Sequence, residues 1–383
     1  MIQLKKDIDC CGCTACASIC SHEAITMKED SLGFLHPHID SSKCINCGLC
    51  EKVCQFNPTY SRFKNYDVSK VYLARIKSNN QLRKSQSGGL FYAIAIKFIQ
   101  NGGIVYGAAF NDKWHVSHQR VDNSTDLEKL RMSKYVQSDM RGIMPYVKKD
   151  LSQDKTVLFS GTPCQISGLK SFIPERLHAN LFCIDIVCHC VPSPKIWSDY
   201  IKYLENKRRK QLIAVQFRDK RFGWHGARES FLYNDGTLEF RRTNNTLFSK
   251  LLSIRRSCTN CPYTNLRRVG DITLGDFWGL PKNSKYEDNK GVSLVLINSE
   301  KGESVLDDIK ETCIIIPGDN YDYKQSQLRE PVKINPLRSQ FLEDYTTKGF
   351  KYIAYRYSDC GWRYKKDRFI SSIKTLLKKA LIQ

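Results

Sequence analysis

Eight of the seventeen cysteines lie near the N-terminus and follow one spacing that occurs twice. The spacing is C-x2-C-x2-C-x3-C, with Cys10, Cys13, Cys16 and Cys20 in the first run and Cys44, Cys47, Cys50 and Cys54 in the second. Three thiolates on one short loop can reach three corners of an iron–sulfur cube, and the fourth corner needs a ligand from elsewhere. The doubled run therefore predicts two [4Fe–4S] clusters and one-electron chemistry.

In bacterial two-cluster domains, the fourth cysteine of each run serves the other cluster. We therefore assign two ligand sets: Cys10, Cys13, Cys16 and Cys54 for one cluster, and Cys44, Cys47, Cys50 and Cys20 for the other. Structural zinc also takes four cysteines, but zinc sites rarely use such a doubled run. The usual pattern has Pro after each fourth cysteine, whereas this chain has Ser21 and Gln55. Cys11 is an additional thiol beside a ligand, which we interpret as a bystander.

Another cysteine opens an expected helix. The segment 160–165 follows a strand expected at 156–159, with Thr162 as the N-cap and Pro163 at the first helical position. This places Cys164 in the first turn, where the positive end of the helix dipole favours a thiolate. The alternatives are a cluster ligand, a redox-active thiol, or an incidental cysteine in a well-capped helix.

Cysteines also occur at two later loops. Cys188-His189-Cys190 follows an apolar strand expected at 181–187, and Cys258-x2-Cys261 is a two-ligand clip. Ligands of doubly wound sheets bind beyond the carboxyl ends of strands. We hypothesise that four thiols bind a third [4Fe–4S] cluster: Cys164, Cys188, Cys258 and Cys261. Half a zinc site, a redox pair and inert buried thiols are the alternatives.

Two further loops have residues suited to a cofactor. Ser87-Gly88-Gly89 lies between an expected strand and helix, where glycines allow a close approach and a helix start offers N–H groups to a phosphate. Such turns are also common without a ligand. In the segment 270–279, Asp276 can orient a ligand or a basic side chain, and Trp278 can cover an aromatic cofactor. Burial of Phe277 and Trp278 in the core is the commoner case.

The alternation of expected strands and helices predicts the fold. We expect an α+β ferredoxin-like N-terminal domain with two [4Fe–4S] clusters, followed by an α/β domain with a mixed sheet. The domains are expected at 1–60 and 66–345, with a basic amphipathic C-terminal segment at 346–383. Helices are expected at 90–99, from 165 and at 195–207. Strands are expected at 71–75, 104–110, 156–159, 181–187, 214–218, 230–233, 237–241, 271–274 and 293–298.

The composition narrows the class of protein. The 383 residues suffice for about two domains, and no stretch approaches the ~20 apolar residues that span a bilayer. With no apolar signal region before the cysteines, we expect a cytoplasmic protein. The net charge of +21 is either a basic solvated surface or an attraction to an anionic partner, such as an acidic electron carrier, a phosphate-bearing cofactor or anionic lipid. No nucleic-acid-binding motif is present, and we expect no nucleic acid partner.

The C-terminal stretch 362–379 is strongly basic and has apolar residues at helical spacing. These residues are Phe369, Ile370, Ile373, Leu376, Leu377 and Ala380. The two interpretations are a terminal helix packed on the preceding domain, and a helix that makes peripheral contact with a membrane surface or docks on a partner.

The loop motifs occur in an order that resembles a known family. They are Ser87-Gly88-Gly89, Ser133-Lys134-Tyr135, Gly161-Thr162-Pro163-Cys164-Gln165, C-H-x-x-P-S-P from Cys188 to Pro194, Cys258-x2-Cys261-Pro262-Tyr263, the segment 271–279 and Gly291-Val292-Ser293. The set resembles the beta-subunit family of coenzyme F420 hydrogenases and dehydrogenases, over roughly residues 1–340. The N-terminal cysteine runs resemble the fused ferredoxin domain of many members. Cys190 is a departure, since many relatives have Gly after the histidine.

The resemblance implies a flavoprotein with FAD beside an iron–sulfur cluster, so that the α/β domain is a flavoprotein domain. By analogy, the FAD contacts are Ser87, Gly88, Gly89, Ser133, Lys134, Tyr135, Gly161 and Thr162. Lys134 would neutralise the pyrophosphate or stabilise reduced flavin, and Lys220 would do the same near the acceptor. His189 is a candidate proton donor, although a histidine beside cysteines is more often a hydrogen-bonding structural residue.

We therefore expect an iron–sulfur, flavin-dependent oxidoreductase that passes electrons between clusters, a flavin and an organic acceptor. A flavin belongs between clusters and a hydride acceptor because clusters carry one electron and hydride chemistry needs two. The acceptor is a deazaflavin such as coenzyme F420 or another small molecule. The alternative is an electron-transfer subunit without its own substrate, which feeds a partner enzyme, for example in exopolysaccharide metabolism. A zinc-bearing interaction protein is a third class.

Overall fold

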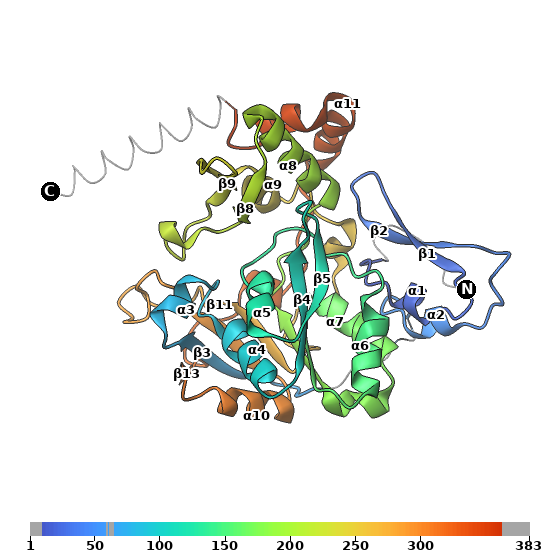
Figure 1. Ribbon diagram of the computed structural model, residues 1–383, viewed down its shortest axis with the longest axis vertical. Helices are drawn as coiled ribbons and strands as arrows, with labels where there is room; N and C mark the ends of the chain where they lie inside the picture. Colours follow the sequence, from blue (N-terminus) through green and yellow to red (C-terminus); the bar gives the residue numbers. More distant parts are fainter. Residues whose placement is uncertain (1–9, 59, 61–64, 362–383) are drawn as a thin grey trace.

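The computed structural model describes residues 10–58, 60 and 65–361. Figure 1 shows the N-terminal domain at the right of a central body, and a lobe above that body. The N-terminal domain has a β-hairpin in which Ile25 pairs with Ile39. Its elements are α1 (Ala15–Ile19), β1 (Ile25–Glu29), β2 (Leu35–Ile39) and α2 (Leu49–Lys52). Each predicted cysteine run therefore starts in a loop and ends at or just after a short helix.

The central body is built on a sheet of eight strands. The sheet is mixed, as the sequence predicts. The strand order is β13-β3-β12-β11-β7-β6-β4-β5. The strands are β3 (Lys70–Ile76), β4 (Ile104–Phe110), β5 (Val116–Val121), β6 (Val157–Gly161), β7 (Leu181–Ile186), β11 (Ile272–Asp276), β12 (Ser293–Ile297) and β13 (Cys313–Pro317). Strands β12, β11, β7 and β6 are rich in aliphatic residues and buried at most positions, as expected for strands covered on both faces.

Five strands of this sheet end at the same edge. Strand β4 is parallel to β6, β6 to β7, and β7 to β11. Strand β12 is antiparallel to both β11 and β3, so that β3 runs in the same direction as the parallel set. The loops that carry the predicted motifs follow the carboxyl ends of β3, β6, β7 and β11. The topology thereby collects motifs from distant parts of the sequence along one edge.

Helices cover both faces of the sheet (Figure 1). On one face, α4 (Leu90–Gln100), α5 (Ser124–Leu130) and α10 (Glu300–Asp308) pack through residues such as Ile94, Leu127 and Leu306. On the other face, α6 (Ile143–Ser152) and α7 (Pro163–Phe172) pack through Val147 and Leu169, among others. The short helix α3 (Asn79–Arg83) follows β3. Helix α7 starts at Pro163, and the Thr162 amide donates to Gln165 Oε1 at 3.0 Å, which confirms the predicted helix start.

The lobe packs around a second apolar core that includes Trp197, Tyr200, Phe231 and Phe341. Its elements are α8 (Pro194–Arg208), β8 (Leu212–Gln216), β9 (Glu229–Tyr233), β10 (Leu238–Arg241), α9 (Thr243–Ser249) and α11 (Arg338–Tyr357). Elsewhere in the described part of the chain, 3₁₀ turns occur at Glu175–Asn180, Lys220–Phe222, Arg256–Asn260 and Ser326–Leu328. Strands β8, β9 and β10 form a separate antiparallel sheet.

The C-terminal part differs from the expected domain limits. The predicted boundary between residues 345 and 346 falls inside α11, which begins at Arg338 and packs on the lobe through Phe341 and Ile353. The basic segment 362–379 lies outside the described residues. Within the described ranges, none of the helices has the length and apolar character that a membrane crossing requires.

Candidate redox site

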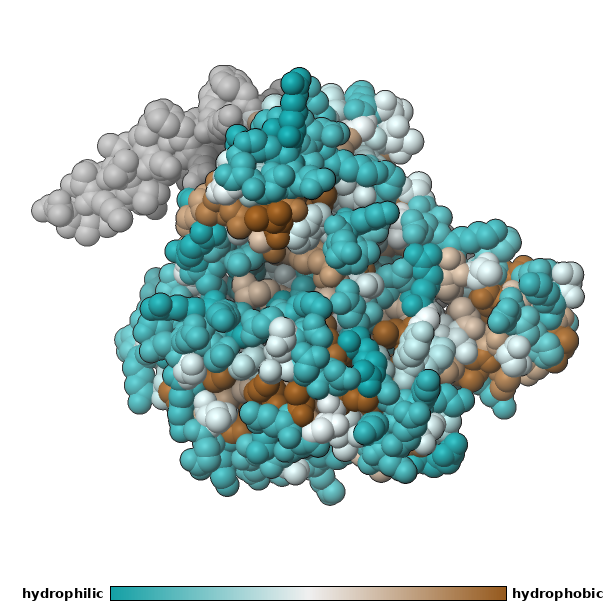
Figure 2. Space-filling model, in the orientation of Figure 1, coloured by the Kyte–Doolittle hydropathy of each residue, from teal (hydrophilic) through white to brown (hydrophobic). Residues whose placement is uncertain are grey.

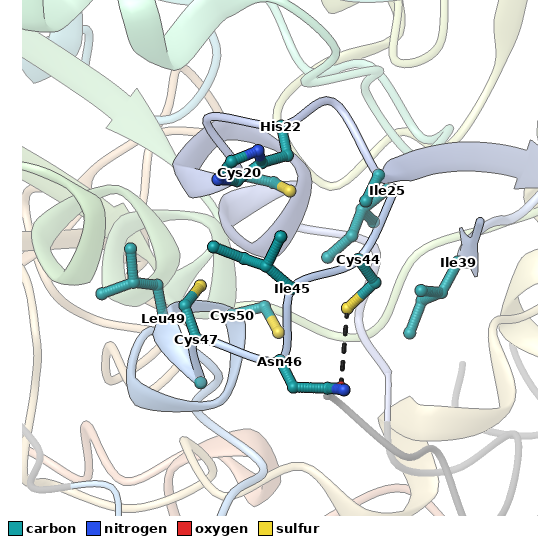
Figure 3. A pocket seen from close by; sticks show the side chains of 12 residues that line it. Cys20, His22, Ile25, Ile39, Cys44, Ile45, Asn46, Cys47, Leu49 and Cys50 are labelled. Atoms are coloured by element: carbon teal, nitrogen blue, oxygen red, sulfur yellow. Dashed lines mark hydrogen bonds between the residues drawn. The ribbon is translucent and has the colours of Figure 1, made fainter. Parts of the chain in front are cut away.

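Four cysteines of the N-terminal domain line one pocket (Figure 3). They are Cys20, Cys44, Cys47 and Cys50. Figure 3 shows their sulfur atoms arranged around a common space, with the side chain of Ile45 among them. The only hydrogen bond drawn in this view joins Cys44 Sγ to Asn46 Oδ1 at 3.7 Å. The structure thus brings Cys20 of the first run to three cysteines of the second, which is the set assigned from the sequence.

The other four cysteines of the doubled run line a second pocket: Cys10, Cys13, Cys16 and Cys54. A hydrogen bond from Cys11 lowers the pKa of Cys13 to about 7, whereas burial raises the pKa of Cys54 to about 11. A metal centre bound by thiols deprotonates them outright. The donor sets of both pockets therefore fit the predicted clusters, and the role of these residues as ligands stays a prediction.

The cysteines of the hypothesised third set also lie near one another. Burial raises the pKa of Cys188 well above its ordinary value, and charges on Cys258, Cys164 and Cys261 act in the same direction. Burial likewise raises the pKa of Cys258 to about 12, with Cys164 and Cys261 contributing. Cys164 starts α7 after β6, Cys188 follows β7, and the other two belong to the loop before β11. Three chain segments thus supply four mutually close thiols.

Cys190 is a fifth thiol beside this set. Burial raises its pKa, and Cys258 and Cys188 are the next contributors. Its backbone φ of 98° lies in the left-handed region that favours glycine. The local backbone therefore explains why glycine suits this position, and the departure to cysteine adds a thiol at a strained residue.

Arg255 joins the third set to the N-terminal domain. Its side chain is 1% exposed, and its guanidinium donates to the carbonyls of Cys10 and Leu35, both at 2.8 Å. It also donates to Gln137 Oε1 at 3.0 Å. Arg255 stands three residues before Cys258, so that one short segment contacts both thiol sets. Sequence reasoning missed Arg255 because nothing in its local pattern indicates a partner in a distant domain.

The Ser87-Gly88-Gly89 loop meets other predicted residues at the edge of the sheet. Ser87 Oγ donates to the carbonyls of Val292 at 2.7 Å and Gly275 at 3.1 Å. Lys220 Nζ donates to the carbonyls of Leu82 at 2.8 Å and Ser87 at 2.9 Å. Burial lowers the pKa of Lys220 to about 8. The predicted cofactor loop, the segment after β11 and Lys220 therefore form one cluster.

The two glycines of this loop have structural reasons of their own. A Cβ atom on Gly88 would lie 2.2 Å from the carbonyl oxygen of Ala74, so that no side chain fits against β3. Gly89 has a φ of 81° and is the N-cap of α4. These contacts account for both glycines without a ligand, and a phosphate contact by this loop stays a prediction.

The Ser133-Lys134-Tyr135 loop is half-buried. Lys134 Nζ donates to the carbonyls of Arg131 at 2.5 Å and Lys129 at 2.9 Å, next to the end of α5. Burial lowers the pKa of Lys134 to about 7. Tyr135 stacks on Phe248 with ring centres 5.2 Å apart, and its hydroxyl is within hydrogen-bond reach of Ser133. The Lys134 ammonium is thus occupied by backbone carbonyls in this structure.

The remaining predicted contacts, Gly161 and Thr162, lie between β6 and α7 beside a buried histidine. His118 Nε2 is 3.0 Å from the Ser160 carbonyl, and its Nδ1 is 2.8 Å from Ser138 Oγ. Burial lowers the pKa of His118 to about 4, so that the ring is neutral at physiological pH. The start of α7 therefore has Cys164 on one side and a neutral imidazole on the other.

Asp276 organises basic and aromatic side chains at the end of β11. It accepts hydrogen bonds from Arg218 Nη1 at 2.7 Å and Trp224 Nε1 at 2.6 Å, which confirms that it orients a basic side chain. Trp278 stacks on buried Trp224 with ring centres 4.8 Å apart and planes 11° apart. Phe277 is fully buried, whereas Trp278 is 42% exposed, so that only Phe277 is a core residue.

His189 belongs to the same neighbourhood. Burial lowers its pKa, and Asp276, Gln325 and Arg218 are the other groups that affect it. Figure 2 shows that this face of the molecule is hollowed below the lobe. Apolar residues of the three-stranded sheet are exposed on the lobe, among them Ile213, Leu238 and Phe240.

The residues at the sheet edge fit a flavin in part. The side-chain oxygen of Gln86, next to the Ser87 loop, is buried and has no hydrogen-bond partner among the described residues. Its Nε2 donates to the Arg218 carbonyl at 2.7 Å, so that the unpaired Gln86 oxygen lies beside the Arg218 backbone. Within residues 10–58, 60 and 65–361, no three His, Cys, Asp or Glu side chains are arranged around a single metal ion. A [4Fe–4S] cube does not require side chains around a single ion, because each of its four thiolates binds a different iron atom.

Comparisons with known proteins match two segments of the chain. Residues 9–57 match the 4Fe-4S dicluster domain, and residues 154–317 match the C terminus of the coenzyme F420 hydrogenase/dehydrogenase beta subunit. No curated protein matches the chain. Among solved structures, it is similar to a chain of the F420-reducing [NiFe] hydrogenase complex from Methanosarcina barkeri, at 15% identity and a TM-score of 0.48. The match covers 72% of this chain and 97% of that one, and a likeness of this degree does not establish a shared activity.

The two matched segments correspond to the two parts described above, the cysteine-lined N-terminal domain and the carboxyl edge of the sheet. They make the protein an iron–sulfur electron-transfer protein. Residues 9–57 match a 4Fe-4S dicluster domain and residues 154–317 match the C-terminal domain of the coenzyme F420 hydrogenase/dehydrogenase beta subunit, which confirms the resemblance inferred from the sequence motifs.

Proposed function

We propose that the protein is an iron–sulfur flavoprotein oxidoreductase that passes electrons between [4Fe–4S] clusters, FAD and a small organic acceptor. The observation that carries this proposal is the spatial order of the thiol sets. Cys11 lies beside both Cys13 of the first N-terminal set and Cys164 at the start of α7, and Cys164 belongs to the third set at the carboxyl edge of the sheet. The loops proposed for FAD lie along that same edge.

In this proposal the three cysteine sets hold the clusters, and Arg255 fixes the N-terminal domain against the third set. When bound, clusters supply one-electron transfer and a flavin links single electrons to hydride chemistry. Lys220 and Arg218 provide positive charge at the edge where a reduced, anionic ring would lie, since both are close to Asp276 and the Ser87 loop. We assign the role of proton donor to His189, because Asp276 and Arg218 are among the groups that affect its pKa.

The exposed indole of Trp278 is the proposed contact for the acceptor. It is backed by Trp224, and the Arg218 guanidinium lies 5.4 Å from the centre of its ring. A flat aromatic face suits a planar ring because the two can stack, and the fixed cation beside it favours the negative charge that such a ring gains on reduction. We propose a planar heteroaromatic acceptor such as a deazaflavin, and the net charge of +21 supports an acidic electron carrier as the other partner.

We also propose a reducing compartment, the cytoplasm, for this protein. All seventeen cysteines are free thiols, and many lie close together. An oxidising compartment favours disulfides between such neighbours.

Anaerobic purification followed by iron and flavin analysis tests the proposal. We expect about twelve irons per chain, which is four for each of three cubes, and one FAD. With a dye as the second partner, the protein should reduce or oxidise a small planar compound. Dye-only activity would instead support the electron-transfer subunit that lacks its own substrate, and a protein without flavin after reconstitution would contradict the proposal.

A further inference from the structure

The cysteine that follows the first predicted ligand lies between two proposed cluster sites. Cys11 is 6% exposed and lines the same pocket as Cys13, and the side chains of Cys13 and Cys164 lie close enough to affect its pKa. Cys13 belongs to the first N-terminal set, and Cys164 belongs to the third set. One buried thiol therefore contacts a member of each set. The interpretation of Cys11 as a bystander does not account for this position.

The amide of Gln55 holds Cys11 in place. Gln55 Nε2 donates to Cys11 Sγ at 3.3 Å and to the Cys164 carbonyl at 2.7 Å. The carbonyl requires a donor, so it fixes which end of the amide faces the thiol. In this orientation Gln55 Oε1 is buried without a hydrogen-bond partner among the described residues. An unpaired buried carbonyl is unfavourable, and this cost is offset by the two contacts of the opposite end.

The backbone of Cys11 is fixed as well. Gln137 Nε2 donates to the Cys11 carbonyl at 2.7 Å, and Arg255 Nη1 donates to Gln137 Oε1 at 3.0 Å. All three residues are buried. The position of the thiol therefore follows from a chain of buried hydrogen bonds that begins in the loop of Cys258.

We propose that Cys11 is a positioning residue whose single S–H proton is shared between Cys13, a ligand of the first ferredoxin cluster, and Cys164, a ligand of the third cluster, and so tunes both. The inference rests on the proposed function because it requires both clusters. Hydrogen bonds to cluster sulfurs set the reduction potential, since a donor stabilises the more negative, reduced form. The thiol keeps its proton throughout, so no bond is formed or broken. Gln55 stands where the usual pattern has proline. Its amide holds Cys11 and Cys164 together, so it is the second residue of this tuning arrangement.

The test uses the full-length protein, reconstituted without oxygen, and four variants. Cys11→Ala removes the thiol, and Gln55→Leu removes the amide that holds it. Cys11→Ser keeps a hydrogen-bond donor, and Cys313→Ala is the matched control. Cys313 is also buried, but it lies in β13, away from the proposed clusters. Iron content and a redox titration followed by electron paramagnetic resonance are measured for each.

We expect unchanged iron in all four variants. In Cys11→Ala and Gln55→Leu the reduction potentials of the first ferredoxin cluster and of the third cluster should fall by about 59 mV. This shift corresponds to a tenfold change in a one-electron equilibrium constant. Cys11→Ser should recover most of this shift, and Cys313→Ala should show none.

Three results would overturn the inference, and they are distinguishable. Full iron with unchanged potentials in Cys11→Ala would remove the tuning role alone. A loss of about four irons in that variant would make Cys11 a ligand. About eight irons in the unsubstituted protein would remove the third cluster from the proposed function and this inference with it.

Discussion

At the scale of single residues, the surroundings of each thiol decide what it can do. The seventeen cysteines include two sets that line separate pockets in the N-terminal domain and a third set on three segments of the body. Cys183, Cys313 and Cys360 are buried in the sheet or the lobe and have no role in the proposal. The same residue type therefore serves as proposed ligand, tuning group and core residue in one chain.

The third set makes a direct prediction about iron. Replacing Cys258 by Ser should lower the iron content by about four atoms per chain, because a [4Fe–4S] cube requires four thiolates. The N-terminal clusters should be retained, since their ligands lie on other loops. Iron analysis of anaerobically purified protein measures the change, with Cys360→Ser in the lobe as the control. Equal iron in the Cys258 variant and the control would contradict the third cluster.

The exposed indole makes a prediction about the acceptor. Trp278→Ala should lower kcat/KM for a planar acceptor by roughly two- to tenfold, since a lost aromatic stacking pair is worth about 0.5–1.5 kcal/mol. The flavin content should not change. Phe240→Ala is the matched control, because Phe240 is a similarly exposed aromatic residue on β10. Steady-state turnover with a dye as electron donor distinguishes the two, and an equal loss in both variants would count against a stacking site at Trp278.

At the scale of secondary structure elements, α7 connects the N-terminal domain to the sheet. It presents Cys164 at its first turn, and a Cβ atom on Gly168 would lie 2.8 Å from both Cβ and Sγ of Cys13. Ser171 Oγ also donates to the Val53 carbonyl at 2.9 Å. The helix therefore packs directly on the loop that holds the first thiol set.

This close packing predicts that Gly168→Ala disturbs the first cluster. The added methyl group has to displace the Cys13 loop, so we expect slower cluster assembly and a lower iron content. Gly107→Ala is the control, since its Cβ would meet Leu130 at 3.4 Å, an ordinary contact. Visible absorption during anaerobic reconstitution reports assembly. Normal assembly in Gly168→Ala would show that α7 does not constrain the Cys13 loop.

The lobe contains a buried carboxyl that predicts a pH dependence. Burial raises the pKa of Glu229 from its ordinary 4.5 to about 8, and Tyr200 donates to it at 2.9 Å. Between these pH values the folded state holds a proton that the unfolded state has lost. The stability from this difference is therefore fully present below about pH 4.5 and is lost as the pH rises towards 8, by at most about 1.4 kcal/mol per pH unit.

Thermal unfolding at pH 6 and pH 8 measures this effect. The unsubstituted protein should unfold at a lower temperature at pH 8, and Glu229→Gln should show a smaller difference between the two pH values. The same pH difference in both proteins would mean that Glu229 is not the group responsible.

The sequence predicted the elements with regular patterns better than the contacts between them. The strand 104–110 and the helix that begins at Pro163 are where the apolar spacing and the Thr162–Pro163 signal placed them. The hairpin of β1 and β2 and the helix α11 were not predicted, because short half-exposed strands and a helix interrupted at Gly349 have weak periodicity. The approach of Arg255, Gln55 and Gln137 to the first cysteine loop depends on packing between distant segments, which no local pattern encodes.

At the scale of the whole molecule, the N-terminal domain lies beside the central body and the lobe lies above that body (Figure 1). The second thiol set lies in the N-terminal domain, the first set meets α7, and the third set leads to the loops after β7 and β11. From this arrangement we expect an electron carrier to dock on the exposed side of the N-terminal domain and the organic acceptor to bind at Trp278.

The most direct measurement is the joint iron and flavin content of the protein after purification and reconstitution without oxygen. The account predicts about twelve irons and one FAD per chain. It also predicts that electrons from a reduced ferredoxin-type carrier protein reach the flavin through the clusters, so that chelation of iron slows flavin reduction by that carrier. A protein that binds no flavin, or whose flavin is reduced at the same rate with and without its iron, would contradict the central claim.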